Sequence, residues 1–131
     1  MKTIKQSVYF DAPPHEIFEL LMDSKKHSLF SGSAAKISRS KGGKISAYDG
    51  YIEGKNLEIL KDKKIVQQWR GSDWDDGAYS VAEFGLEKKG KGCTLTFTQK
   101  NVPDKNYSSI KQGWVDYYWA PMKEYLKGMK K

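Results

Sequence analysis

The sequence predicts an α+β fold in which a curved antiparallel β-sheet of about six to seven strands is wrapped around a long C-terminal helix. Three observations support this prediction. Short runs rich in β-branched and aromatic residues, separated by turn residues, occupy residues 34–101. Two short helical patterns follow the first strand, within residues 11–30. Apolar residues then recur three or four positions apart from residue 110 towards the C-terminus.

The N-terminal part of the chain is predicted to form one strand and two short helices. Residues 3–10 contain β-branched and aromatic side chains, which favours a strand. Pro14 suits the first turn of the helix that follows, because an N–H at that position has no partner within the helix. The apolar stripe of this helix consists of Ile17, Phe18, Leu20 and Leu21. A second short helix is expected from Ser24 to Phe30.

The middle of the chain is predicted to form antiparallel strands joined by tight turns. The expected strands are residues 35–38, 44–48, 51–60, 64–70, 79–87 and 93–99. Their connections are too short for the crossovers that parallel strands require. Gly54 lies inside the third of these strands, where we expect a bulge or a bend.

Alternation of apolar and polar residues along three of these strands predicts one buried and one solvated sheet face. The residues expected on the buried face are Ile65, Gln67, Trp69, Ala82, Phe84, Leu86, Cys93, Leu95, Phe97 and Gln99. The C-terminal helix is the expected cover for this face, and Pro121 should kink it. Its apolar stripe contains Ile110, Trp114, either Tyr117 or Tyr118, Met122 and Tyr125. This order of elements defines the helix-grip fold, and residues 1–131 are expected to form a single domain.

Composition and charge narrow the classes of function. The net charge is +7, which suits an acidic partner, but only two of the 23 basic residues, Arg39 and Arg70, are arginine. Lysine is less suited than arginine to binding phosphates and bases, so nucleic-acid binding is not expected. The single cysteine, Cys93, excludes an internal disulfide and favours a reducing compartment. Neither a signal peptide nor a membrane span is evident, and a cytoplasmic location is expected.

The sequence contains no recognisable catalytic, metal-binding or cofactor-binding motif. Cys93 lies on the apolar face of a strand, and His15 and His27 fall on different predicted helices. Asp73, Asp75 and Asp76 cluster in the loop of residues 71–77, the acidic loop, which lacks the downstream glutamate of a calcium-binding EF-hand loop. The alternative is a polar loop in which Trp74 caps one end of the sheet. We therefore predict a non-enzymatic binding module without a cofactor.

Between the C-terminal helix and the sheet, the predicted fold leaves either an apolar cavity or a filled core. The residues expected to line such a cavity, and to bind a ligand there, are Gln67, Trp69, Phe84, Phe97, Trp114, Tyr118 and Met122. In the alternative of a filled core, tyrosine hydroxyls would satisfy the glutamines Gln67 and Gln99.

Three segments carry a resemblance to a known family. They are residues 33–60, 63–80 and 94–126, with the strings GGK…DGY, IVQxWR and GWxxYYWxPMKxYL. Over residues 7–126 the chain resembles the C-terminal domain of the activator of the heat shock protein 90 (Hsp90) ATPase. That domain is part of the START-like (SRPBCC) superfamily, which includes the birch-pollen allergen. The resemblance implies a helix-grip fold, whereas the additional N-terminal domain of the eukaryotic activators has no room in these 131 residues.

Two functions follow from these observations. The first is a co-chaperone or stress-related protein that binds a chaperone of the Hsp90 family, as the resemblance implies. Its contact needs exposed groups, and we expect the loop residues Asp73, Trp74 and Asp75, together with surface lysines, to provide them. The second is a carrier or sensor of a small apolar ligand. The sequence predicts no oligomeric state.

Overall fold

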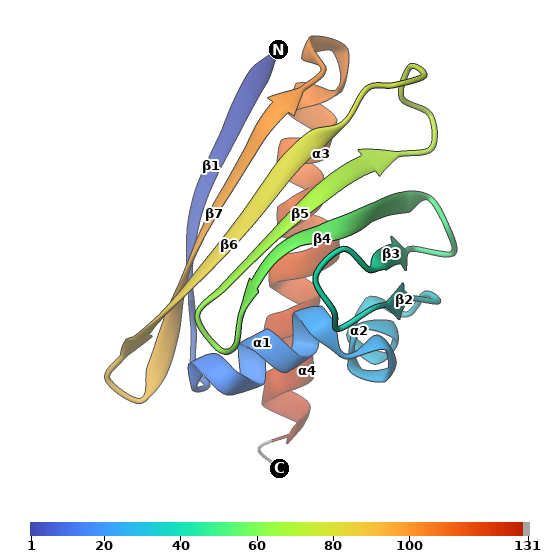
Figure 1. The fold of residues 1–131 in the computed structure, drawn as a ribbon. Helices are drawn as coiled ribbons and strands as arrows, with labels where there is room; N and C mark the ends of the chain where they lie inside the picture. The colour runs from blue at the N-terminus through green and yellow to red at the C-terminus, as the bar shows by residue number, and fades with distance from the viewer. Residues whose placement is uncertain (130–131) are drawn as a thin grey trace.

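A computed structural model of the chain describes residues 1–129 and shows a seven-stranded antiparallel sheet with the order β1-β7-β6-β5-β4-β3-β2 (Figure 1). The strands are β1 (Lys2–Phe10), β2 (Lys36–Ile37), β3 (Lys44–Ala47), β4 (Ile52–Leu60), β5 (Lys64–Gly71), β6 (Ser80–Lys89) and β7 (Gly92–Val102). The helices are α1 (Pro14–Met22), α2 (Ser24–Ser31), a 3-10 turn (Asp104–Asn106), α3 (Tyr107–Trp114), a π-helical turn (Val115–Trp119) and α4 (Ala120–Met129). This arrangement confirms the predicted helix-grip fold.

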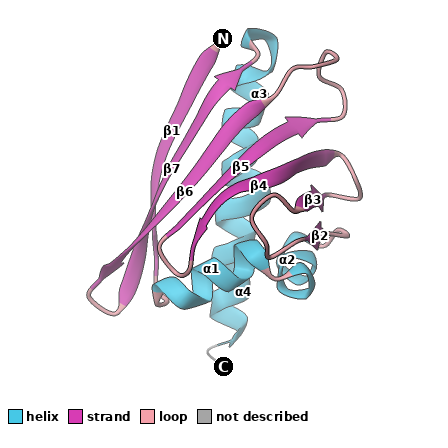
Figure 2. Cartoon of the chain, in the orientation of Figure 1, coloured by secondary structure: helices cyan, strands magenta, loops and turns pink. Residues whose placement is uncertain are grey.

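One long C-terminal helix, formed by α3, the π-turn and α4, runs along one face of the sheet (Figures 1 and 2). The short helices α1 and α2 lie across one end of the sheet, and α2 contacts α4. The core therefore lies between the sheet and three helical segments, which are α1, α2 and the long C-terminal helix.

No helix within residues 1–129 has the length and apolar character that a bilayer span requires.

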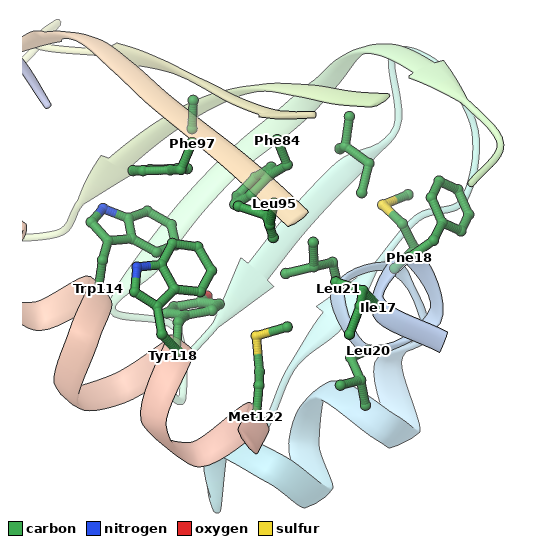
Figure 3. Close-up of a cluster of buried hydrophobic side chains, with 14 of the residues drawn as sticks. Ile17, Phe18, Leu20, Leu21, Phe84, Leu95, Phe97, Trp114, Tyr118 and Met122 are labelled. Atoms are coloured by element: carbon green, nitrogen blue, oxygen red, sulfur yellow. The ribbon is translucent and has the colours of Figure 1, made fainter. Parts of the chain in front are cut away.

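The inner face of the sheet carries the residues that alternation predicted. Ile65, Gln67 and Trp69 of β5 are buried, and so are their counterparts on β6 and β7. Figure 3 shows Trp114, Tyr118 and Met122 of the C-terminal helix pointing towards this face. Each large side chain removed from water in this way contributes about 1.5–3 kcal/mol to folding. The predicted cover is therefore confirmed.

The bulge in β4 lies at a different residue from the one expected. The register shifts between Asn56 and Glu58, so that Leu57 is the extra residue. Gly54 is required for another reason: a Cβ at this position would lie 1.7 Å from the carbonyl oxygen of Gln68. The glycine thus allows β4 and β5 to approach closely, and the prediction of a bulge at Gly54 was wrong.

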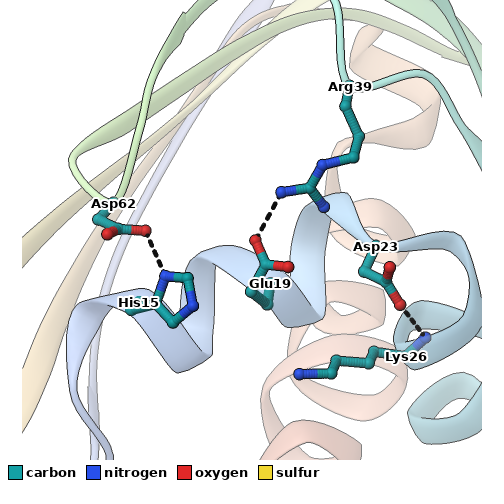
Figure 4. A network of polar contacts seen from close by, with 6 residues as sticks. All are labelled: His15, Glu19, Asp23, Lys26, Arg39 and Asp62. Carbon is teal, nitrogen blue, oxygen red and sulfur yellow. Dashed lines mark hydrogen bonds and ion pairs between the residues drawn. The ribbon is translucent and has the colours of Figure 1, made fainter.

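Polar contacts fix α1 to the sheet at both of its ends (Figure 4). His15 Nδ1 lies 2.9 Å from Asp62 in the β4–β5 turn, and Arg39 donates to Glu19 over 2.7 Å. The Asp23 carboxylate then caps the next helix by accepting from the Lys26 backbone N–H at 2.9 Å. These contacts hold the two short helices across the end of the sheet.

Serine hydroxyls of α2 cover the free edge of the sheet at β2. Ser24 Oγ accepts from the Ile37 backbone N–H at 2.8 Å, and Ser28 Oγ accepts from that of Ala35 at 3.0 Å. An uncovered strand edge offers unpaired backbone groups to other chains. Helix α2 removes that opportunity at this edge.

A π-turn lies immediately before Pro121, where a kink was expected. Ala120 N–H donates to the carbonyl of Val115, five residues earlier. Because Pro121 has no N–H, it leaves the carbonyl of Tyr117, four residues earlier, without its helical donor. The hydroxyl of Tyr48 donates to this carbonyl instead. In this geometry Tyr118 faces the sheet, whereas Tyr117 is 59% exposed.

Candidate functional site

The structure brings together all seven residues predicted to line an internal cavity. Each of them is buried between the sheet and the C-terminal helix: Gln67, Trp69, Phe84, Phe97, Trp114, Tyr118 and Met122. Trp114 lies at their centre, with ring centroids 4.3 Å from Phe97 and 4.5 Å from Tyr118. Their common location agrees with the prediction, while their role in ligand binding stays a prediction.

Aromatic side chains fill this interior almost completely. The internal space between Leu21, Gln67, Phe84 and Tyr118 has a volume of about 20 Å³. A cavity of that size is close to the minimum that holds one water molecule. The filled-core alternative therefore describes the space between the helix and the sheet.

The buried glutamines have partners other than the tyrosine hydroxyls expected. Trp114 Nε1–H donates to Gln99 Oε1 at 2.8 Å, and Gln99 Nε2 donates to Ser80 Oγ at 2.8 Å. Ser80 Oγ donates in turn to the carbonyl of Trp69 over 2.7 Å. Gln67 Nε2 donates to Asn56 Oδ1 at 3.2 Å. This polar chain fixes the orientation of the indole at the centre of the core.

An open cleft adjoins the filled core. It has a volume of about 350 Å³ and lies between the C-terminal helix and the β3–β4 connection. Its lining residues are Tyr48, Tyr51, Ile52, Trp69, Ser109, Ile110, Gly113, Trp114, Tyr117 and Tyr118. We call it the aromatic cleft. Of the seven predicted lining residues, only Trp69, Trp114 and Tyr118 reach it.

The wall of the aromatic cleft on the sheet side depends on an unusual turn. Tyr48 and Asp49 have φ angles of 50° and 57°, in the left-handed region that bulky residues rarely adopt. Such strained residues persist where surrounding contacts hold them. Here the contacts are the hydrogen bond from the Tyr48 hydroxyl to the Tyr117 carbonyl and the two bonds between Asp49 and the Ala34 backbone.

Sequence reasoning did not connect Tyr48 with the C-terminal helix, although two signals for it were present. Asp49-Gly50 marks the turn, and Pro121 follows Tyr117 by four residues. Nothing in the sequence pairs these two signals, because 69 residues separate the hydroxyl from the carbonyl.

A buried histidine stands behind the floor of the cleft. His27 Nε2 lies 3.1 Å from the Tyr118 hydroxyl, and its Nδ1 lies 3.4 Å from the Leu21 carbonyl oxygen. Since a carbonyl only accepts, Nδ1 carries the proton and Nε2 accepts from Tyr118. Burial lowers the pKa of His27 to about 4, although the bond to Leu21 opposes this. The imidazole is therefore neutral at physiological pH.

The acidic loop differs from its prediction at one residue. Asp73 and Asp75 are exposed, as expected, but Trp74 is only 3% exposed and packs on Trp69 with ring centroids 5.6 Å apart. The indole caps this end of the sheet, as the alternative interpretation of the loop predicted, and the expectation that Trp74 offers an exposed surface to a partner was wrong. Arg70 fixes the loop by donating to the carbonyls of Trp74 and Asp75 over 2.7 and 3.2 Å.

Reactive groups are sparse among the described residues. Cys93 is fully buried on β7, and burial raises the pKa of its thiol. Within residues 1–129, no three histidine, cysteine or acidic side chains gather as metal ligands. The chemistry that the arrangement supports best is binding, through aromatic surface and exposed charges.

Comparisons with known sequences agree on one family. The sequence model of the family described as "Activator of Hsp90 ATPase homolog 1-like protein" matches residues 11–127. The human activator of 90 kDa heat shock protein ATPase homolog 1 is 24% identical over 122 residues, which cover 93% of this chain and 36% of that protein. A Dictyostelium discoideum homolog is 29% identical over 114 residues, with coverages of 86% and 30%. The chain thus spans about a third of the length of these curated relatives.

Solved structures share the whole fold. The crystal structure of an HSP90 activator from Plasmodium falciparum has a TM-score of 0.90 and 26% identity, and the match covers 97% of both chains. The solution structure of the Aha1 dimer from Colwellia psychrerythraea has a TM-score of 0.80 at 16% identity, covering 95% of each chain. At 16% identity, the similarity to the Colwellia psychrerythraea structure shows a shared fold and nothing more.

Proposed function

Because the chain belongs to the family of Activator of Hsp90 ATPase homolog 1-like proteins, we propose that it is a non-enzymatic, co-chaperone-like module that binds an Hsp90-family chaperone. One observation carries the proposal. The Plasmodium falciparum protein, which is described as an HSP90 activator, matches this chain over 97% of both lengths. We place the protein in the cytoplasm, which agrees with its single, buried, free cysteine.

The acidic loop is the best-defined exposed surface for this contact. Its backbone is fixed by Arg70, and its tryptophan is anchored in the core. Asp73 accepts from the Tyr51 hydroxyl at 2.7 Å, and Asp75 accepts from Lys105 Nζ at 3.0 Å. Both carboxylates are therefore presented in defined positions, which lowers the entropy lost when a partner binds. We propose Asp73 and Asp75 as partner-binding residues, with Trp74 as the support beneath them.

The double substitution Asp73→Lys with Asp75→Lys is expected to weaken chaperone binding by about tenfold or more, because it reverses both proposed contact charges and removes their bonds to Tyr51 and Lys105. Binding is measured by calorimetry or pull-down with an Hsp90-family chaperone of the same organism, at about 50 and 300 mM salt. Screening at the higher salt should weaken a contact between exposed charges.

A matched control reverses two carboxylates at the opposite end of the molecule. Glu87→Lys with Glu124→Lys gives the same change of net charge. Both side chains are exposed, Glu87 near the β6–β7 turn and Glu124 on α4, and these elements lie away from the β5–β6 loop in Figure 1. If wild-type protein captures no chaperone even at low salt, the proposed function is wrong. If both double variants lose the same affinity, the chaperone is bound but the loop is not the contact.

The aromatic cleft supports a second candidate function, binding of a small apolar ligand. Its volume of about 350 Å³ is within the range of known ligand sites, and aromatic rings form most of its lining. Tyr51 and Ser109, which carry hydroxyl groups, belong to its lining. We propose Trp69, Trp114 and Tyr118 as the ligand contacts, because the other four predicted residues lie in the filled core.

Gly113→Leu is expected to abolish ligand binding without unfolding the protein. A Cβ at Gly113 meets only Tyr117 Cδ2, at 3.7 Å, so a leucine side chain can enter the cleft. A thermal-shift assay with 2-naphthol measures this. At ten times its dissociation constant, a bound probe should raise the wild-type melting temperature by roughly 4–6 °C.

Gly128→Leu is the control for helix propensity. Both variants replace a helical glycine with leucine, and this replacement favours the helix by about 0.8–1 kcal/mol. Gly128 differs from Gly113 in that it is exposed and has open space around it. This variant should keep the shift with 2-naphthol. An equal shift in Gly113→Leu and wild type would show that the probe binds elsewhere.

A further inference from the structure

The outer face of β2, β3 and β4 carries a second hollow that neither proposed function uses. It is shallow and open, with a volume of about 790 Å³, at the end of the sheet where β2 is the edge strand (Figure 1). Its polar lining includes Lys36, Ser38, Lys44, Ser46, Lys55 and Gln68. We call it the basic hollow.

Strand register places the three lysines of the basic hollow close together. Lys44 of β3 lies directly opposite Lys55 of β4, and Lys36 of β2 lies opposite Ser46. Strand spacing and rise put the Cα atoms of Lys36 and Lys44 roughly 8 Å apart. Like charges directly opposite each other on a sheet destabilise it.

The carboxylates of the described residues leave this charge uncompensated. Glu53, the only acidic residue in the lining, pairs with Arg70 over 3.3 Å. Within residues 1–129, no ion pair joins Lys36, Lys44 or Lys55 to a carboxylate. A positive cluster that the fold tolerates without a counter-charge of its own is suited to an anionic partner.

A buried amide makes the wall of the basic hollow rigid. Asn56 is fully buried, and its Nδ2 donates to the carbonyls of Ser38 and Ser40 over 2.6 and 3.1 Å. Its backbone N–H donates to the Gly43 carbonyl, and its own carbonyl accepts from Gly42 N–H. The β2–β3 connection is therefore held against β4, so little ordering is needed when a ligand binds.

We propose that the basic hollow binds an acidic, extended polypeptide segment of a partner protein. Carboxylates two residues apart in an extended chain are roughly 7 Å apart, close to the spacing of the lysines. The hollow has lysines and hydroxyls but no arginine in its lining, and arginine is the residue that forks onto phosphates and stacks on bases. The proposal concerns the binding surface and the negative charge of the segment, and it does not depend on which protein supplies that segment.

The test is fluorescence anisotropy with a labelled peptide of alternating glutamate and serine, at about 50 mM salt. Wild-type protein should bind it, and a peptide with glutamine in place of glutamate should not bind. Lys44→Glu with Lys55→Glu should weaken binding by about tenfold or more. Lys88→Glu with Lys89→Glu, in the exposed β6–β7 hairpin, gives the same charge change and should alter it by less than about threefold.

Several outcomes would overturn the proposal. They are no binding of the peptide to wild type, equal losses in the two double variants, and tighter binding of a single-stranded RNA or of phosphatidylserine vesicles at the same lysines.

A separate measurement tests the charge argument itself. Lys55→Glu alone should raise the melting temperature, because it turns a like-charged pair into an opposite one. A lower melting temperature would remove the basis of the inference.

Discussion

Replacing Trp114 with alanine is expected to lower the free energy of unfolding by about 3–5 kcal/mol. The indole is only 2% exposed and contacts the rings of Phe97 and Tyr118 at the centre of the core. Its removal opens a cavity that rigid neighbours cannot fill. It also leaves Gln99 Oε1 without its donor, and an unpaired buried acceptor costs about 1–3 kcal/mol by itself.

Urea unfolding followed by circular dichroism measures this loss, because fluorescence changes with the substitution itself. Trp114→Phe should cost less than Trp114→Ala, since it keeps an aromatic ring while it removes the donor and part of the volume. Tyr117→Ala, on the exposed side of the same helix, should cost less than about 1 kcal/mol. A loss below about 1 kcal/mol for Trp114→Ala would contradict the central position of this residue.

Acidification is expected to destabilise the protein by about 3 kcal/mol through His27 alone. Burial lowers the folded-state pKa of His27 to about 4, whereas its ordinary value is 6.5. Between these two values the unfolded chain binds a proton that the folded protein does not. Stability therefore falls as the pH drops from about 6.5 towards 4, and His27 contributes no pH dependence above that range.

Unfolding curves of wild type and His27→Gln at several pH values between 7 and 4 measure this contribution. The variant is less stable at neutral pH, because Tyr118 and the Leu21 carbonyl lose their partner, but it lacks the imidazole that titrates. The difference in stability between the two proteins should therefore shrink on acidification. Parallel curves would show that His27 is not held neutral in the folded state.

The candidate sites were predictable only in part. The inward position of Trp69, Trp114 and Tyr118 follows from spacing along single elements, and this set forms the floor of the aromatic cleft. The rim formed by Tyr48 and Tyr51 was not predicted, because the expected strands 44–48 and 51–60 included both residues, whereas the structure places them in the turn between β3 and β4. The basic hollow was not predicted either, since the pairing of Lys44 with Lys55 depends on register between strands.

The sequence by itself determined the helix-grip fold, the buried sheet face and the family, because strand alternation, helical spacing and motif strings are local properties. Only the tertiary structure decided the burial of Trp74, the bulge at Leu57, and the partners of Gln99 and His27. The physical reason is distance along the chain. Most buried polar atoms find a partner, but the interior offers groups from every element, and His27 takes one that is 91 residues away.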